Sequence, residues 1–151
     1  MNFFKNIQTV TILTTALFFA MPALAATLEF RVVGRGNATI ATESVEFAPG
    51  TNVGQLTVET LRRLNVPFVG DVGGINSIEG LGSDMVTGST NGVAWLKAYG
   101  WCFRAGEIIP DTMPDETPLA ADVTTLTWFY AFAKAVGNDW VSMCEPAEAA
   151  E

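Results

Sequence analysis

One segment of the sequence, Val53 to Leu64, has the clear spacing of an amphipathic helix, whereas the other strongly patterned segments alternate like strands. Thr51 or Asn52 can cap the amino end of this helix, and Asn65 and Pro67 end it. Its apolar residues fall on one side and its charged residues on the other. Because a single helix has one face to bury, we expect it to cover one face of a sheet and to leave the opposite face largely open.

The amino-terminal part of the domain is predicted to be a hairpin. Thr27 to Val33 and Ile40 to Phe47 both alternate between apolar and polar residues, and the turn-forming cluster Gly34 to Asn37 separates them. The strongest strand pattern is Thr124 to Ala133, which is rich in aromatic and β-branched residues. We therefore expect that strand to lie centrally in the sheet.

Another strand is predicted at Gly100 to Gly106, where the chain enters a tight turn. Its alternation places Trp101 and Phe103 on the inward face and Cys102 and Arg104 on the outward face. The cysteine of this strand is thus expected to point away from the core.

The middle of the chain is less regular. Short strands are predicted at Ile75 to Leu81 and at Glu107 to Ile109, and the small polar residues of Gly82 to Gly92 predict a mobile loop. Val93 to Tyr99 fits either a helical turn or an edge strand. Pro110 to Pro118 holds three prolines and predicts an irregular surface loop.

This order of elements predicts the α+β class. We expect a β-grasp-like two-layer fold in which one helix packs on a mixed sheet of four to six strands. The folded domain is predicted to span residues 26–133, and residues 134–151 are predicted to be a tail with a frayed acidic end.

Residues 1–25 have the pattern of a secretory signal peptide. A short basic start containing Lys5 precedes an apolar run from Ile7 to Met21, and Pro22 and Ala23-Leu24-Ala25 follow it. The alternative is a membrane anchor, but the apolar run is shorter than the roughly 20 residues that a spanning helix needs. The sequence predicts a periplasmic or secreted protein with no stable membrane span after signal cleavage.

The two cysteines, Cys102 and Cys144, both lie in the mature part of the chain. Two cysteines in an exported protein most simply form one disulfide, and two free thiols are the alternative. No CxxC motif accompanies them, which argues against a redox enzyme. We expect the disulfide to tie the tail back and to bring Trp140 and Met143 over the outward-facing Phe129.

Charge and composition exclude several classes of partner and of catalytic site. Without Lys5, the mature chain keeps 7 basic and 16 acidic residues, so nucleic acid and anionic membranes are disfavoured partners. The chain has no histidine, which removes Ser–His and Cys–His arrangements. Asp111, Asp115 and Glu116 can in principle hold calcium, but their spacing matches no EF-hand, so a solvated acidic loop is predicted. We expect no catalysis and no metal site.

The aromatic residues supply the candidate binding site. Trp101 and Trp128 fall on inward positions and are predicted to be core. Trp95, Tyr99 and Trp140 fall in the predicted loops and tail, where they can form a stacking surface for a flat or apolar ligand, or an anchor for a protein partner. Packing beneath the loops and tail is the alternative for these three residues.

Four motifs occur in an order that resembles the transcobalamin-like carboxy-terminal domain family: Pro49-Gly50-Thr51 before the helix, Ile75 to Leu81, Gly100-Trp101-x-Phe103 with Gly106, and Leu126 to Tyr130. The resemblance covers about Thr27 to Ala133. It implies a β-grasp domain that is exported in bacteria, and in the cobalamin carriers such a domain closes over one face of a corrinoid while a separate helical barrel holds the other. The chain differs from those carriers in having no barrel and in carrying the extra tail.

The leading hypothesis is therefore an exported, non-catalytic binding module for a small ligand, with no cofactor of its own and with a corrinoid implied only by the resemblance. The alternative is a structural or protein-interaction domain of the cell envelope. Asn37-Ala38-Thr39 is a glycosylation sequon, which matters only in a host that glycosylates.

Overall fold

The computed structural model describes residues 25–148, so the predicted signal peptide and the last residues of the tail lie outside the described part of the chain. The strands are β1 (Ala26–Val33), β2 (Thr39–Phe47), β3 (Phe68–Asp71), β4 (Gly74–Ile78), β5 (Leu81–Gly82), β6 (Asp84–Thr90), β7 (Val93–Ala105), β8 (Thr125–Val136) and β9 (Asp139–Pro146); the helix is α1 (Val53–Arg63), and η1 (Arg35–Asn37) is a 3₁₀ turn.

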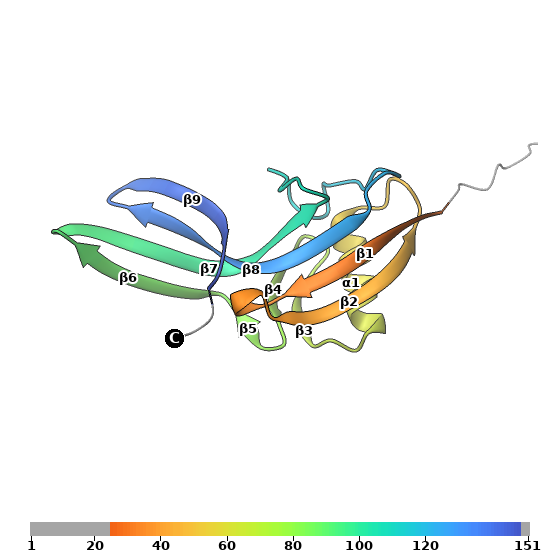
Figure 1. The fold of residues 1–151 in the computed structure, drawn as a ribbon, viewed down its shortest axis with the longest axis horizontal. Coiled ribbons are helices and arrows are strands. Elements are labelled where there is room, and N and C mark those ends of the chain that lie inside the picture. Colours follow the sequence, from red (N-terminus) through yellow and green to blue (C-terminus); the bar gives the residue numbers. More distant parts are fainter. Residues whose placement is uncertain (1–24, 149–151) are drawn as a thin grey trace, which may run out of the picture.

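Six of the strands form one mixed sheet, which confirms the predicted α+β class (Figure 1). The strand order is β2-β1-β8-β7-β6, with β1 and β8 parallel and the other pairs antiparallel. Strand β8 is central, as predicted, because β7 pairs along one of its edges while β1 and β9 share the other edge.

One face of this sheet carries the core. Alternate residues of β1 (Leu28, Phe30 and Val32) are buried there, and the apolar side of α1 packs over them. The helix begins where it was expected, because the Asn52 side chain accepts a hydrogen bond from the Gln55 amide at 2.7 Å. In Figure 1 the helix lies behind β1 and β2, so the sheet is covered by α1 on one side only.

A buried hydrogen-bond chain ties the helix to the central strand. The Thr57 hydroxyl donates to the Val53 carbonyl at 2.7 Å and accepts from the Trp128 indole N–H, also at 2.7 Å. Thr57 is fully buried and Trp128 nearly so, so water cannot replace either partner.

Thr57→Val is therefore expected to lower the free energy of unfolding by about 1–2 kcal/mol, because it leaves the buried indole N–H without an acceptor. Thr57→Ser keeps the hydroxyl and is the matched control. Denaturant unfolding measures the stability, and the NMR shift of the Trp128 indole proton should move in Thr57→Val but not in Thr57→Ser. Equal stability of Thr57→Val and the parent would show that this bond contributes nothing.

A second, three-stranded sheet corrects the prediction for the middle of the chain. Ile75 to Leu81 was expected to be one strand, but the chain reverses at Glu79 and Gly80, whose φ angles are +52° and +74°. Strands β4 and β5 are consequently separate and pair as a hairpin, with β3 on the other side of β4. The strand expected at Glu107 to Ile109 is also wrong, since only an isolated bridge joins Ile108 to Ala105.

The mobile loop expected at Gly82 to Gly92 is wrong as well, because most of it is strand β6. It pairs with β7 through a two-residue turn at Asn91 and Gly92, both at positive φ, as this type of hairpin requires. The ambiguous segment Val93 to Tyr99 is the first half of β7. Both segments lie beyond the reach of α1, so neither acquires the alternation that burial of one face imposes (Figure 1).

The tail is also more ordered than predicted. It extends β8 to Val136 and then forms β9, and Ala147 beyond it is buried. The predicted disulfide is confirmed, with 5.9 Å between the Cα atoms of Cys102 and Cys144. Cys102 belongs to β7 and Cys144 to β9, and both strands pair with β8. Strands two apart in a flat sheet are about 10 Å from each other, so β9 must bend out of the sheet plane to form the disulfide. Figure 1 shows β9 curving back across β7 and β8.

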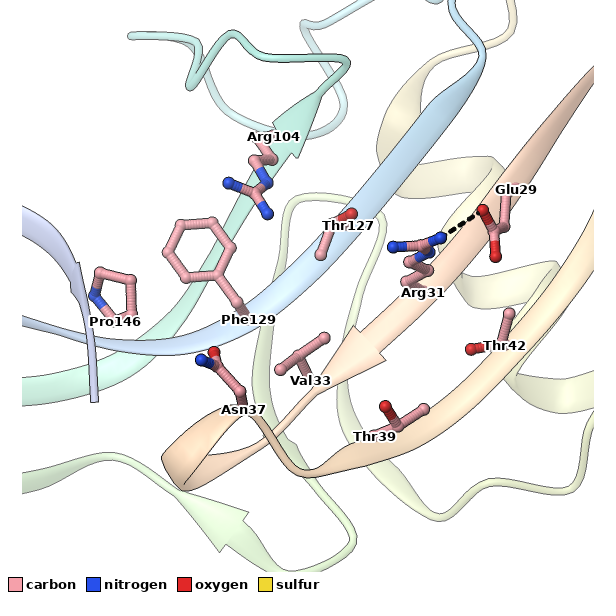
Figure 2. A pocket seen from close by; sticks show the side chains of 10 residues that line it. All are labelled: Glu29, Arg31, Val33, Asn37, Thr39, Thr42, Arg104, Thr127, Phe129 and Pro146. Carbon is pink, nitrogen blue, oxygen red and sulfur yellow. Dashed lines mark hydrogen bonds and ion pairs between the residues drawn. The ribbon is translucent and has the colours of Figure 1, made fainter. Parts of the chain in front are cut away.

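The prediction that Trp140 and Met143 cover Phe129 is wrong. Trp140 and Met143 are 57% and 67% exposed and do not shield Phe129. Pro146, at the end of β9, lies beside its ring instead (Figure 2). The bend of β9 thus turns the two large side chains outward and brings the strand's last residue over the sheet.

Candidate functional site

The three predicted aromatic site residues lie on two different faces. Trp95 and Tyr99 are on the face of β7 that continues the core face, since their β8 partners are Val136 and Phe132. Trp140 pairs with Ala135, which belongs to the opposite face. The structure therefore brings Trp95 and Tyr99 onto one strand face and leaves Trp140 apart from them.

Trp95 lies against Gly88 of the neighbouring strand. A Cβ on Gly88 would come within 2.3 Å of the Trp95 ring, so the indole occupies the space that a side chain at residue 88 would need. This cross-strand arrangement, an aromatic ring over a glycine, stabilises a sheet edge. Trp95 has this structural partner in addition to any ligand.

Tyr99 belongs to an aromatic cluster with a cation on it. Its ring stacks on Tyr130 at a centroid distance of 6.0 Å, and the Arg35 guanidinium lies 4.7 Å and 4.8 Å from the two ring centroids. The Tyr130 hydroxyl donates to the Gly82 carbonyl at 2.6 Å, and burial raises the pKa of this phenol while Arg35 opposes that rise. Through these cation–π contacts, Arg35 holds η1 against the sheet beside β5 and β6.

The open face of the sheet carries a hollow that the sequence analysis did not single out. It has a volume of about 530 Å³, within the range of small-molecule sites. Figure 2 shows the side chains around it, which come from β1, η1, β2, β7, β8 and β9. The lining residues are Glu29, Arg31, Val33, Asn37, Thr39, Thr42, Arg104, Thr127, Phe129 and Pro146.

Strand register explains why these residues meet. Arg31 of β1 pairs with Thr42 of β2 on one side and with Thr127 of β8 on the other, and Thr127 pairs with Arg104 of β7. The four side chains therefore form one row across four adjacent strands. Since neighbouring strands are about 4.8 Å apart, the two arginines start about 10 Å from each other with a hydroxyl between them.

The second row of the hollow is more apolar. Val33 pairs with Thr39 and with Phe129, and Phe129 pairs with the disulfide-bonded Cys102. The Phe129 ring is mostly buried, and Pro146 closes this end of the hollow. A ligand in the hollow would thus meet cationic and hydroxyl groups in one row and hydrocarbon in the next.

The two arginines differ in their electrostatic state. Arg31 is paired with Glu29 at 2.6 Å, and that carboxylate raises the pKa of the guanidinium. Arg104 makes no ion pair within the described residues and lies 5.7 Å from the Phe129 ring centroid. The hollow has two cations and one anion, although the whole chain carries a net charge of −8. Arg104 is consequently the cation best placed to meet an incoming anion.

No protein-family model, characterised protein or solved structure matches this chain. Within residues 25–148, no helix is long and apolar enough to cross a membrane, and no group of three or more acidic or cysteine side chains is arranged to hold a metal ion.

Proposed function

We propose that this protein is an exported, non-catalytic binding module that takes a small ligand in the hollow on the open face of its sheet. The observation that carries the proposal is the cross-strand row that contains Arg31, Thr127 and Arg104 in an otherwise acidic chain. A pair of guanidinium groups with a hydroxyl between them suits a carboxylate or phosphate. Phe129 and Pro146 supply the apolar surface that the rest of the ligand would cover.

Export is supported by the disulfide, which is consistent with an oxidising location outside the cytoplasm. Together with the predicted signal peptide, it favours the periplasm or the exterior. A module there meets its ligand outside the cell or in the envelope.

The resemblance to transcobalamin-like domains makes a corrinoid the first ligand to test. Such a ligand carries amide groups and a phosphate on its periphery, which the arginines and threonines of the hollow can bind. The open sheet face would then cover one side of the macrocycle, as the resemblance implies. Smaller anions with an apolar group are the other ligands that fit this chemistry.

Arg104→Ala is expected to weaken ligand binding by about tenfold or more, because it removes the cation that lacks an ion pair. Isothermal titration of the mature protein with cyanocobalamin, cobinamide and a panel of aromatic carboxylates and phosphate esters measures the affinity. Arg62→Ala, on the exposed side of α1, changes the net charge equally and should leave the affinity unchanged. Absence of saturable binding by every compound, or equal binding by Arg104→Ala and the parent, would contradict the proposal.

The second candidate function is a protein-interaction domain of the envelope. It is favoured by the large apolar side chains that strands β6, β7 and β9 leave exposed. These are Met85, Val86, Val93, Trp140, Val141 and Met143.

A further inference from the structure

Strand β7 has an unpaired edge over its last residues. Strand β6 pairs with β7 only as far as Asp84, which is opposite Tyr99. Beyond that point β7 continues to Ala105, which forms an isolated bridge with Ile108. Within the described chain, Gly100 to Arg104 therefore pairs with a strand on one side only. Strands β4 and β5 of the small sheet lie near β7 without pairing with it, and the Trp101 indole donates to the Leu81 carbonyl at 2.8 Å.

The backbone groups at this edge point outward. Ala105 exchanges hydrogen bonds with Ile108, on the side away from β8, at 2.9 Å and 3.2 Å. Because successive residues of a strand point their N–H and C=O groups to opposite sides, those of Phe103 and Trp101 point the same way as those of Ala105. Two N–H and two C=O groups are thus available at the free edge for one further strand.

A groove lies at this edge. It has a volume of about 300 Å³, and Trp101, Cys102 and Phe103 line it from the strand itself. The segments 73–76 and 109–114 form its other walls, with Ile75, Pro110 and Pro114 among the lining residues. Ile109 and Met113 are about half exposed at its rim. The groove therefore combines a strand edge with apolar walls, which is what an extended peptide needs.

Acidic side chains flank the groove, although the residues that line it carry no charge. No lysine or arginine lies between Arg63 and Lys97 or between Arg104 and Lys134, the two stretches that supply these walls. A Cβ placed on Gly73, a wall residue, would lie 3.3 Å from Asp71 Oδ1 and 3.8 Å from Asp115 Oδ2. Both carboxylates thus lie beside the groove. Asp111 is exposed between the lining residues Pro110 and Thr112, but it does not line the groove itself.

From these observations we propose that the free edge of β7 binds an extended peptide segment with alternating apolar and basic residues, which adds as a strand in line with β6. The unpaired groups of Trp101 and Phe103 supply the backbone hydrogen bonds, and the groove receives the apolar side chains. The carboxylates of Asp71, Asp111 and Asp115 select a cationic partner. A free edge of about five residues spans about 17 Å, enough for one short strand.

The site is distinct from the hollow on the open face, so the two proposals can fail separately. The probe is a fluorescein-labelled peptide of alternating valine and lysine, titrated into the mature, oxidised protein and followed by fluorescence anisotropy. We expect saturable binding and slower hydrogen exchange at the amides of Trp101 and Phe103 in the complex. The same peptide with valine and glutamate, or with N-methylated backbone amides, should bind at least about tenfold more weakly.

Asp111→Lys with Asp115→Lys is expected to weaken binding of the valine–lysine peptide by about tenfold or more. Glu46→Lys with Asp122→Lys changes the net charge equally at exposed positions outside the groove. This control should weaken binding of the peptide less than Asp111→Lys with Asp115→Lys does. Failure to bind, equal loss in both double variants, or exchange protection elsewhere would overturn the proposal. Protection of Trp101 and Phe103 in a dimer without peptide would also overturn it, since a second copy would then be the occupant.

Discussion

Replacing Cys102 and Cys144 together with serine is expected to lower the free energy of unfolding by about 4 kcal/mol. The two cysteines are 42 residues apart, and closing a loop of that size removes conformational entropy from the unfolded chain, which raises its free energy by about this much. For a domain of this length the melting temperature should fall by about 10–20 °C. The loop encloses β8, the strand that all the other parts of the main sheet pair with directly or through β1 and β7.

The effect should be largest in β9, because apart from the disulfide that strand is held mainly by its irregular pairing with β8. Its large side chains Trp140, Val141 and Met143 are exposed, and Ala147 is the buried residue that follows it. The Ala147 amide donates to the Tyr130 carbonyl, and its carbonyl accepts from the Gly36 amide, both at 2.9 Å. In the double variant we expect these bonds to open before the rest of the sheet does.

Differential scanning calorimetry and residue-resolved hydrogen exchange measure these two effects. The parent protein in a reductant should behave like the double variant, whereas Ser142→Ala, a single substitution in β9, should leave the melting temperature within about 3 °C of the parent. A double variant that melts within the same interval would show that the disulfide does not stabilise the fold. Uniform loss of protection would show that β9 does not open separately.

The elements that could be predicted from the sequence are those that bury one face. The period of α1 and the alternation of β1 and β8 follow from contact with a single core, and the cap at Asn52 follows from a local hydrogen bond to the helix backbone. The disulfide was predictable for a different reason, because two cysteines in an exported chain have one partner each. These features depend on local sequence and on burial.

The remaining elements depend on pairings that leave no local pattern. Strands β6 and β9 and the first half of β7 lie away from α1, so both of their faces accept small, polar and apolar residues alike. The Asn91-Gly92 pair was the signal that could have revealed the β6–β7 hairpin, since this dipeptide favours a two-residue turn.

The hollow could not be predicted for a related reason. Its row of residues exists because β1 and β8 are parallel neighbours with Arg31 opposite Thr127, almost a hundred residues further along. Alternation indicates which side chains face outward, but it does not indicate which outward residues lie side by side. Arg104 was placed correctly on the outward face, yet its proximity to Arg31 depends on that long-range register.

The second large effect is expected at Gly54, in the first turn of α1. Helix propensity alone predicts that Gly54→Ala stabilises the protein, because alanine is about 1 kcal/mol better than glycine within a helix. The structure predicts the opposite sign. A Cβ on Gly54 would lie 1.8 Å from the Val72 carbonyl oxygen and 2.7 Å from its carbonyl carbon, and these backbone atoms cannot rotate away.

We expect Gly54→Ala to lower the free energy of unfolding by about 3 kcal/mol, at the upper end of overpacking effects. The helix would have to move off the turn between β3 and β4, although the Gly54 amide is also held by the Pro114 carbonyl at 2.9 Å. Gly100→Ala is the matched control, because a Cβ on Gly100 meets nothing within 4 Å and should change stability by less than about 0.5 kcal/mol. Urea unfolding of both variants decides the sign. If Gly54→Ala is more stable than the parent, helix propensity outweighs the steric clash with the Val72 carbonyl. The helix would then not be in close contact with the small sheet at that point.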